Sequence, residues 1–201
     1  MFAAATPSRH DRRSIVDAAL HLLDEVGLPD LSMRRLAAVL DVQPSALYWH
    51  FDSKQALLAA VADRILERVP ADASDAHGVA RGIRDALFTY RDGAEVVMSS
   101  FALGLGADRA HEQLVRVLPD TDPARAARST SALLQFVLGH ALVVQQRLHA
   151  ASHGATDSPM DPASDIEETF DLGVTAFLRG LNTSEPPMKA TAPGAPDHVP
   201  K

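Results

Sequence analysis

The 201-residue chain contains no cysteine, which excludes a disulfide framework and any cysteine-ligated metal site. It also lacks a long uninterrupted apolar run, because its most apolar stretch, 132–144, is broken by polar residues and is too short to cross a bilayer. The first six residues are too few for the apolar segment of a secretory signal. We therefore expect a soluble, cytoplasmic protein with no membrane partner.

Positive charge is scarce over the whole chain, but it is unevenly distributed. The formal net charge is −7, which at first disfavours a nucleic-acid partner. Residues 1–68 carry 8 basic and 9 acidic side chains, whereas residues 69–201 carry 11 and 17. DNA binding requires a local cationic face rather than a basic protein. The first third of the chain can supply such a face from Arg9, Arg12, Arg13, Arg34, Arg35 and Lys54.

Apolar residues recur at helical spacing along most of the chain. Between residues 15 and 26 the apolar residues recur at spacings of three and four positions, which is typical of an amphipathic helix. Gly27 follows as a residue that commonly ends a helix. Ser32 is a natural N-cap for a second helix, and Pro44 suits the first turn of a third. Asp52 resembles the cap of a longer helix that reaches residue 69 or so.

The remaining signals are also helical, so we predict an all-α fold without a sheet. Further helices are expected near residues 79–90, 125–150 and 166–181, with breaks at 92–93, 119–123 and 152–164. The pattern predicts an N-terminal three-helix domain at 1–54 and a C-terminal helical domain at 55–184. Residues 185–201 are rich in proline and hold little that packs, so we expect a disordered tail there.

The segment 31–54 carries the strongest functional signal. It predicts two short helices joined by a tight turn, as in a helix-turn-helix. The second helix of such a pair presents its N-terminal residues to base edges in the major groove, and here these are Gln43, Pro44 and Ser45. The side chains expected to reach phosphates are Tyr48, His50 and Lys54.

A plain three-helix bundle with a chance pattern is the alternative interpretation of this segment. Aromatic side chains such as Tyr48, Trp49 and Phe51 are, taken one at a time, more typical of a core than of a contact surface. The combination of caps, turn and small packing residues favours the helix-turn-helix.

The stretch from Arg12 to Ile65 resembles the tetracycline-repressor (TetR) family of transcriptional regulators. The resemblance rests on Ile15-Val16-Asp17-Ala18-Ala19-Leu20, on Leu31-Ser32-Met33-Arg34-Arg35-Leu36-Ala37, and on Ala46-Leu47-Tyr48-Trp49-His50-Phe51 with Lys54. Weaker likeness extends to Tyr90-Arg91-Asp92-Gly93-Ala94, to Leu138-Gly139 with Gln145-Gln146, and to Phe177-Leu178-Arg179-Gly180-Leu181. The likeness covers most of the chain and is dense only in its N-terminal quarter.

The resemblance implies a homodimeric repressor that binds a palindromic double-stranded DNA operator and is released by a small-molecule inducer. It implies no cofactor and no enzymatic activity, and half-site centres roughly 34–36 Å apart. Arg34 then joins the predicted base readers, and residues 55–184 form a ligand-binding and dimerisation domain. The last helix and the apolar face of 129–146 would form a four-helix bundle between subunits, or bury their residues within one subunit, or both.

The magnesium–drug site known in this family is altered in this chain. Its two histidines, amide and acidic residue fall at positions that here hold Pro70, Val79, Val97 and Val144. Hard cations need oxygen ligands, which these side chains do not offer. We therefore expect no metal and no tetracycline–magnesium binding in that mode.

An apolar cavity is the ligand site that the sequence predicts instead. Its expected polar groups are His140 and Gln145, which would orient the ligand. The alternative is an ordinary helical core with a satisfied histidine. The predicted lining residues are Ile83, Leu87, Val97, Met98, Phe101, Leu133, Phe136, Val137, His140 and Val144.

Two other functions remain as alternatives at this point. One is a DNA-binding regulator without a small-molecule effector. The other is a small all-α enzyme, which is disfavoured because no motif pairs a nucleophile with a base. Activation of transcription stays open as an alternative to the expected repression.

Overall fold

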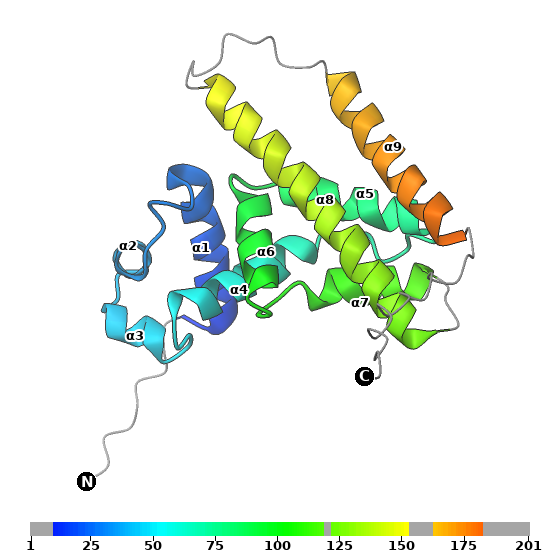
Figure 1. Ribbon diagram of the computed structural model, residues 1–201. Helices are drawn as coiled ribbons and strands as arrows, with labels where there is room; N and C mark the ends of the chain where they lie inside the picture. The colour runs from blue at the N-terminus through cyan, green and yellow to red at the C-terminus, as the bar shows by residue number, and fades with distance from the viewer. Residues whose placement is uncertain (1–9, 119–121, 153–162, 183–201) are drawn as a thin grey trace, which may run out of the picture.

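A computed structural model describes residues 10–118, 122–152 and 163–182. All regular structure in these ranges is α-helical, which confirms the predicted all-α fold (Figure 1). The helices are α1 (Arg12–Val26), α2 (Met33–Val39), α3 (Pro44–Tyr48), α4 (Lys54–Leu66), α5 (Ala76–Phe88), α6 (Gly93–Ala102), α7 (Asp108–Val117), α8 (Pro123–Ser152) and α9 (Ala163–Asn182). The predicted tail at 185–201 and Arg9 lie outside the described residues.

Local capping fixes the ends of the first helices. Gly27 ends α1 with a φ of 78°, a left-handed conformation that residues with a Cβ adopt rarely. The Ser32 hydroxyl accepts a hydrogen bond from the Arg35 amide at 3.2 Å, as a helix N-cap does. Pro44 occupies the first turn of α3. These three sequence predictions are confirmed.

Two predicted helix starts are wrong. Ser53, not Asp52, caps α4, because the Ser53 hydroxyl accepts from the Ala56 amide at 3.1 Å. The helix expected near residues 79–90 starts earlier, at Ala76, because the Asp75 carboxylate accepts from the Gly78 amide at 2.7 Å and caps α5. A hydroxyl or carboxylate at either of two adjacent polar positions can cap a helix, and the sequence alone did not distinguish them.

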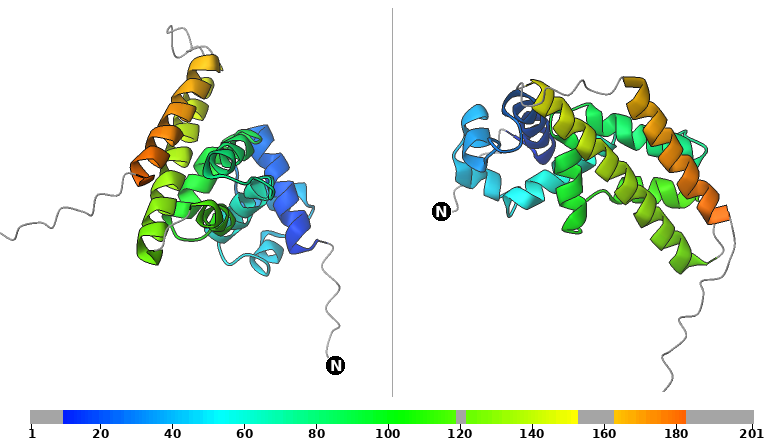
Figure 2. Two further views of the ribbon diagram at one scale, coloured as in Figure 1. Left: turned by 90° about the vertical axis from the view of Figure 1, so that its right-hand side faces the viewer. Right: turned by 45° about the horizontal axis from the view of Figure 1, so that its top comes forward.

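Helix α4 joins the two parts of the molecule. It packs against α1 on one side and against α6 and α5 on the other (Figures 1 and 2). Its buried residues Val61, Ala62 and Ile65 have no more than 1% of their surface exposed. The domain boundary predicted after residue 54 therefore falls at the start of a helix that both parts share, and it stays a proposal.

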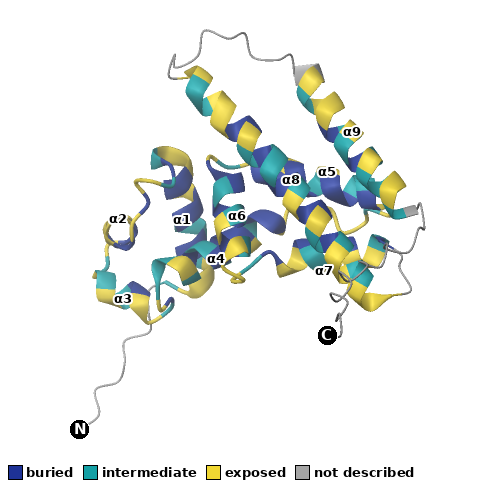
Figure 3. Ribbon diagram, viewed as in Figure 1, coloured by how far each residue is buried: buried dark blue, intermediate teal, exposed yellow. Residues whose placement is uncertain are grey.

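Helix α8 forms the centre of the C-terminal part. It is the one helix in the described ranges that is long and apolar enough, by length and composition, to cross a membrane. Its inward face packs against α5, α6, α7 and α9, and Leu133, Val137 and Ala141 are fully buried there (Figure 3). This burial is typical of a core helix.

The turn between α5 and α6 connects α8 to α1. The Gln145 amide nitrogen of α8 donates to the Leu87 and Tyr90 carbonyls, each at 3.1 Å, and its oxygen accepts from the Ala94 amide at 2.9 Å. From the same turn, the Asp92 carboxylate accepts from the Leu28 amide at 2.8 Å, just after α1. A continuous hydrogen-bonded path therefore runs from α8 to the N-terminal helices.

Candidate DNA interface and effector-binding body

The turn between α2 and α3 is built as a helix-turn-helix requires. Asp41 adopts a left-handed φ of 53°, which aspartate tolerates better than most residues. The Val42 amide then donates to the Ala37 carbonyl at 3.0 Å and closes the turn. Behind it, Leu36 and Leu47 are buried to 1% exposure or less, so α2 and α3 are held against a common core.

The N-terminus of α3 is open to solvent. Gln43 and Ser45 are exposed, and the Gln43 side chain makes no capping hydrogen bond. Pro44 is half-buried and has no amide hydrogen to satisfy. This end of α3 therefore presents unoccupied polar side chains outward, as a helix that reads base edges must do.

The aromatic residues after α3 point in different directions. Phe51 is buried at 1% exposure, as expected for a core residue, but Tyr48 is 50% and Trp49 is 90% exposed. The alternative interpretation, in which these aromatics are core residues, therefore holds for Phe51 and not for Tyr48 or Trp49. One ring suffices to fill this small core, and the other two extend beside the exposed face of α3. Trp49 was absent from the predicted contacts.

The remaining predicted DNA contacts lie on the flanks of α3. Arg34 is exposed in the first turn of α2, and Lys54 is half-buried as the first residue of α4. His50 is half-buried, and its carbonyl accepts from the Arg12 guanidinium at 2.6 Å. The same guanidinium lies 4.2 Å from the Phe51 ring centroid, so Arg12 braces this segment against α1.

The ten predicted effector residues are brought together on α5, α6 and α8, but mostly as packed core. Five of them have no exposed surface, namely Ile83, Leu87, Val97, Leu133 and Val137. Val144 is 7% exposed, and Met98, Phe101, Phe136 and His140 are half-buried. An effector that reaches the first five must displace side chains that are packed together in this structure.

A cavity of about 280 Å³ lies between α8 and α9, and three of the ten residues, Phe136, His140 and Val144, line it. Burial lowers the pKa of His140, and the nearby Arg84 lowers it further, so this imidazole is neutral at pH 7. Its Nδ1 atom is buried without a hydrogen-bond partner. Among the expected polar groups of the pocket, His140 therefore remains available to bind a polar partner.

Gln145 is not available as a ligand-orienting group. Both ends of its amide are engaged with the backbone of the α5–α6 turn, as described above, and the residue is 8% exposed. The prediction that Gln145 orients a ligand is corrected, because backbone groups of the turn take up its amide.

A buried arginine ties α5 to α9 and was not anticipated from the sequence. Arg84 is 4% exposed, and its two terminal nitrogens lie 2.8–2.9 Å from the carboxylate of Glu167. The guanidinium carbon also lies 4.5 Å from the Phe170 ring centroid. The i,i+3 spacing of Glu167 and Phe170 on one helix face is the signal that suggests a shared partner.

Comparison with known proteins gives a consistent result for both parts of the chain. Residues 15–61 match the family model for bacterial regulatory proteins of the tetR family, and residues 73–171 match that of the tetracyclin repressor-like C-terminal domain. The class D tetracycline repressor protein of Escherichia coli is 33% identical over 195 residues, covering 88% of each chain. The chain belongs to the tetracycline-repressor (TetR) family.

Solved structures of TetR-family proteins match the whole described architecture. BioQ of Mycobacterium smegmatis superposes with a TM-score of 0.77 at 37% identity, covering 86% of this chain and 98% of that one. A structure of BioQ with its double-stranded DNA operator gives a TM-score of 0.74 at 35% identity, covering 88% and 100%. This TetR-family protein therefore has the fold of DNA-binding transcriptional regulators, with a helix-turn-helix and a helical C-terminal domain.

The positions of the family's magnesium–drug site carry apolar side chains in the structure. Val79, Val97 and Val144 are buried, and Pro70 is exposed after α4. None of these side chains has an oxygen or nitrogen that can ligate a cation. That this chain binds no tetracycline–magnesium chelate in that mode stays a prediction.

Proposed function

We propose that this TetR-family protein is a cytoplasmic transcriptional repressor that binds a palindromic operator as a homodimer and is released by a mainly apolar small molecule. The proposal rests on one observation: α3 is held in the core by a buried leucine, while its N-terminal polar residues are exposed to solvent. Leu47 is 1% exposed, while Gln43 and Ser45 on the same short helix are exposed. A bundle built only for stability has no need to leave that face open.

Roles for the exposed residues follow from their positions. Arg34, Gln43, Pro44 and Ser45 are proposed to contact base edges, because they surround the N-terminal end of α3. The proposed phosphate contacts are Tyr48, His50 and Lys54. These assignments make specific and non-specific contributions to binding separable.

Unpartnered apolar residues on α8 and α9 support the homodimer. The two helices lie side by side on the outside of the C-terminal part (Figure 2). Val143 is 51%, Leu148 is 41% and Leu172 is 71% exposed. A second copy of the chain would cover these side chains in a four-helix bundle and would place two copies of α3 on one face. Phe170 and Val174 of α9 are fully buried within one subunit.

Release by an effector requires movement in the C-terminal part to reach α3. Residues proposed to meet the effector lie on α5, α6 and α8, and α6 packs directly against α4. Helix α4 in turn packs on α1, and the path from Gln145 through Asp92 to Leu28 adds a polar link. Opening the core around Val97 is therefore expected to shift α4 and change the distance between the two α3 helices.

The DNA-binding part of the proposal is tested by gel shift on an operator identified from genomic binding sites, over a salt series. Affinity should fall steeply as salt rises, because phosphate contacts release counterions. Tyr48→Ala should weaken binding to matched and mismatched operators alike, whereas Gln43→Ala should change the preferred base at one position. Equal losses for both variants on every operator would contradict these roles, and salt-independent or absent binding would contradict the function.

The effector part is tested by release of the operator complex. Phe136→Ala and His140→Ala should alter the concentration of the cognate small molecule needed for release while leaving operator binding intact. If both variants respond like the wild type, the effector does not contact these residues. A regulator without an effector would show no small molecule that releases it.

A further inference from the structure

Three consecutive side chains at the start of α1 each bind a different helix end. The Asp11 carboxylate caps α1 itself. On one side of it, the His10 Nε2 atom donates to the Leu40 carbonyl at 3.1 Å. On the other side, the Arg12 guanidinium donates to the His50 carbonyl at 2.6 Å. The beginning of α1 is therefore attached by two side chains to segments 30 and 38 residues further along the chain.

The two carbonyls lie at the two ends of the helix-turn-helix. Leu40 is the C-cap of α2, and His50 follows the last residue of α3 by two positions. Carbonyl groups at a helix C-terminus have no partner within the helix, so they need donors from elsewhere. The histidine ring and the guanidinium supply those donors. Side chains from the start of α1 thus fix both the end of α2 and the segment just after α3.

Helix α3 needs this support, because its own packing is slight. It has five residues, too few for a helix to be stable alone. Its buried residue is Leu47, and it packs on α2, whereas α1 packs on α2 and α4. One buried side chain can hold a short helix in place, but it does not fix the direction of the helix axis. A second attachment just after α3 does fix that direction.

The contacts of Arg12 depend on the shape of its guanidinium as well as on its charge. The guanidinium carbon lies 4.2 Å from the Phe51 ring centroid, while one terminal nitrogen donates to the His50 carbonyl. A planar guanidinium can stack on a ring and donate from its edge at the same time, whereas an ammonium group is a point charge without that plane. Lysine at this position could therefore keep the charge but not both contacts.

We propose that His10 and Arg12 are positioning residues for operator recognition: they hold the helix-turn-helix against α1, so that α3 meets the DNA groove in one orientation. The inference rests on the proposed function for the role of α3. Fixing that orientation before binding lowers the entropy cost of association. Both residues act through α3 and not through a phosphate contact of their own.

The first test measures the affinity of the full-length protein for its operator duplex over a salt series. Arg12→Met should lower the affinity about tenfold, as expected for the loss of a hydrogen bond from a charged group. The slope of log affinity against log salt should not change, because no phosphate contact is lost. Arg12→Lys should give an intermediate affinity. His10→Leu should lower the affinity about fivefold, and His10→Gln, which keeps an N–H donor, should lower it less.

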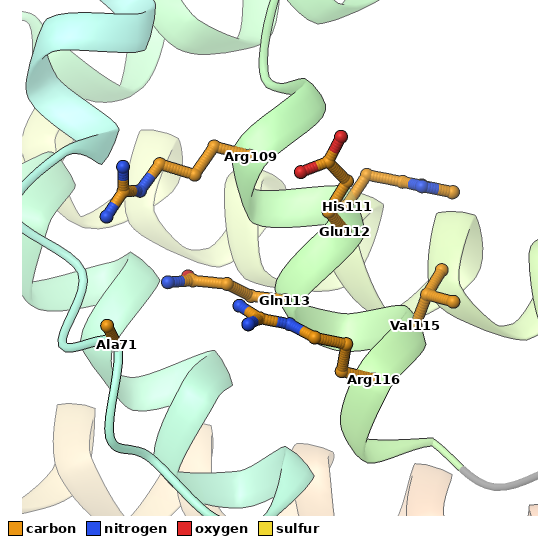
Figure 4. A pocket seen from close by; sticks show the side chains of 7 residues that line it. All are labelled: Ala71, Arg109, His111, Glu112, Gln113, Val115 and Arg116. Atoms are coloured by element: carbon orange, nitrogen blue, oxygen red, sulfur yellow. The ribbon is translucent and has the colours of Figure 1, made fainter.

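Two other arginines provide matched controls. Arg68, beyond the end of α4, also lies over a ring, 5.7 Å from the Tyr90 centroid, and donates to the Tyr90 hydroxyl at 3.3 Å. Arg116 of α7 lines a cavity together with Ala71 in the C-terminal part (Figure 4). Arg68→Met removes a similar contact, and Arg116→Met removes the same charge. Both variants should bind the operator within about twofold of wild type, well inside the tenfold loss of one charged hydrogen bond.

The second test uses amide hydrogen exchange to separate positioning from overall stability. The His50 and Phe51 amides both donate to the Leu47 carbonyl, at 3.0 and 2.9 Å. Arg12→Met should accelerate the exchange of these two amides, because the segment after α3 opens locally. The amide of Ile65, in the buried part of α4, should exchange at the wild-type rate.

Four results would overturn the positioning role. They are wild-type affinity in both Arg12→Met and His10→Leu, the same affinity loss in the control variants, equal acceleration of every amide, or a salt slope lowered by about one with full recovery by lysine, which would assign Arg12 to a phosphate. Wild-type protein that binds no duplex would refute the proposed function itself. Wild-type binding with unchanged affinity of the His10 and Arg12 variants would keep the function and refute this inference alone.

Discussion

Replacing Gln145 with leucine should cost this protein about 3 kcal/mol of unfolding free energy, because its amide makes three hydrogen bonds in the interior. Leucine fills nearly the same volume but leaves the Ala94 amide and the Leu87 and Tyr90 carbonyls without that partner. An orphaned buried donor costs about 1–3 kcal/mol, and each lost carbonyl contact adds about 0.5–1.5 kcal/mol. This sum is a large fraction of the typical total stability of about 5–15 kcal/mol.

The neighbouring residue provides the control. Gln146 is exposed, and its amide makes one long contact with Glu95, at 3.4 Å. Gln146→Leu should therefore change stability by less than about 0.5 kcal/mol. In thermal unfolding at equal protein concentration, the Gln145 variant should melt about 6–12 °C below the wild type. Equal melting of the two variants would show that the amide does not support the α5–α6 turn.

Three further changes test other contacts. Gly173→Ala should destabilise the fold, because a Cβ there would lie 2.2 Å from a ring carbon of Phe136. Gly180→Ala is the control, because a Cβ at that position meets nothing within 4 Å. In urea unfolding, the midpoint should fall for the Gly173 variant and stay close to wild type for the Gly180 variant. Burial raises the pKa of Asp63, so the stability this group contributes is complete at acid pH and is lost as pH rises through that pKa. Asp63→Asn should therefore be more stable than wild type at pH 7, with the gap closing toward pH 4 in pH-dependent melts, and a gap independent of pH would contradict this assignment. Arg84→Met should unfold within about 1.5 kcal/mol of wild type, because methionine fills the buried space and the carboxylates left behind, on Asp85 and Glu167, are 58% and 53% exposed and stay hydrated. A loss of several kcal/mol in denaturant titration would show that the ion pair itself stabilises α9.

Much of the architecture is encoded locally, and those parts were predictable. The glycine after α1, the serine before α2 and the proline in α3 each have one dominant structural use, so the helix-turn-helix was correctly placed. Residues with two equivalent uses were not resolved. Asp52 and Ser53 can each cap a helix, and the sequence pattern did not show that Ser53 is the residue that caps α4.

The interior of the C-terminal part depends on contacts between distant segments, and the sequence prediction was weaker there. Helical spacing placed Ile83, Leu133 and Val137 on inward faces, but it did not distinguish a packed core from an open pocket. Gln145 was assigned to a ligand because its backbone partners, more than 50 residues away, are not visible in a sequence pattern.

The exposed indole beside α3 allows DNA binding to be followed by tryptophan fluorescence. Trp49 is the one tryptophan of the chain and is 90% exposed, so its fluorescence reports on a single, water-facing location. A duplex docked on α3 would exclude water from that ring and change both the intensity and the wavelength of its emission. Quenching by dissolved iodide would fall at the same time. The protein therefore carries an intrinsic optical probe at its proposed DNA interface, and binding can be followed without a dye or a label.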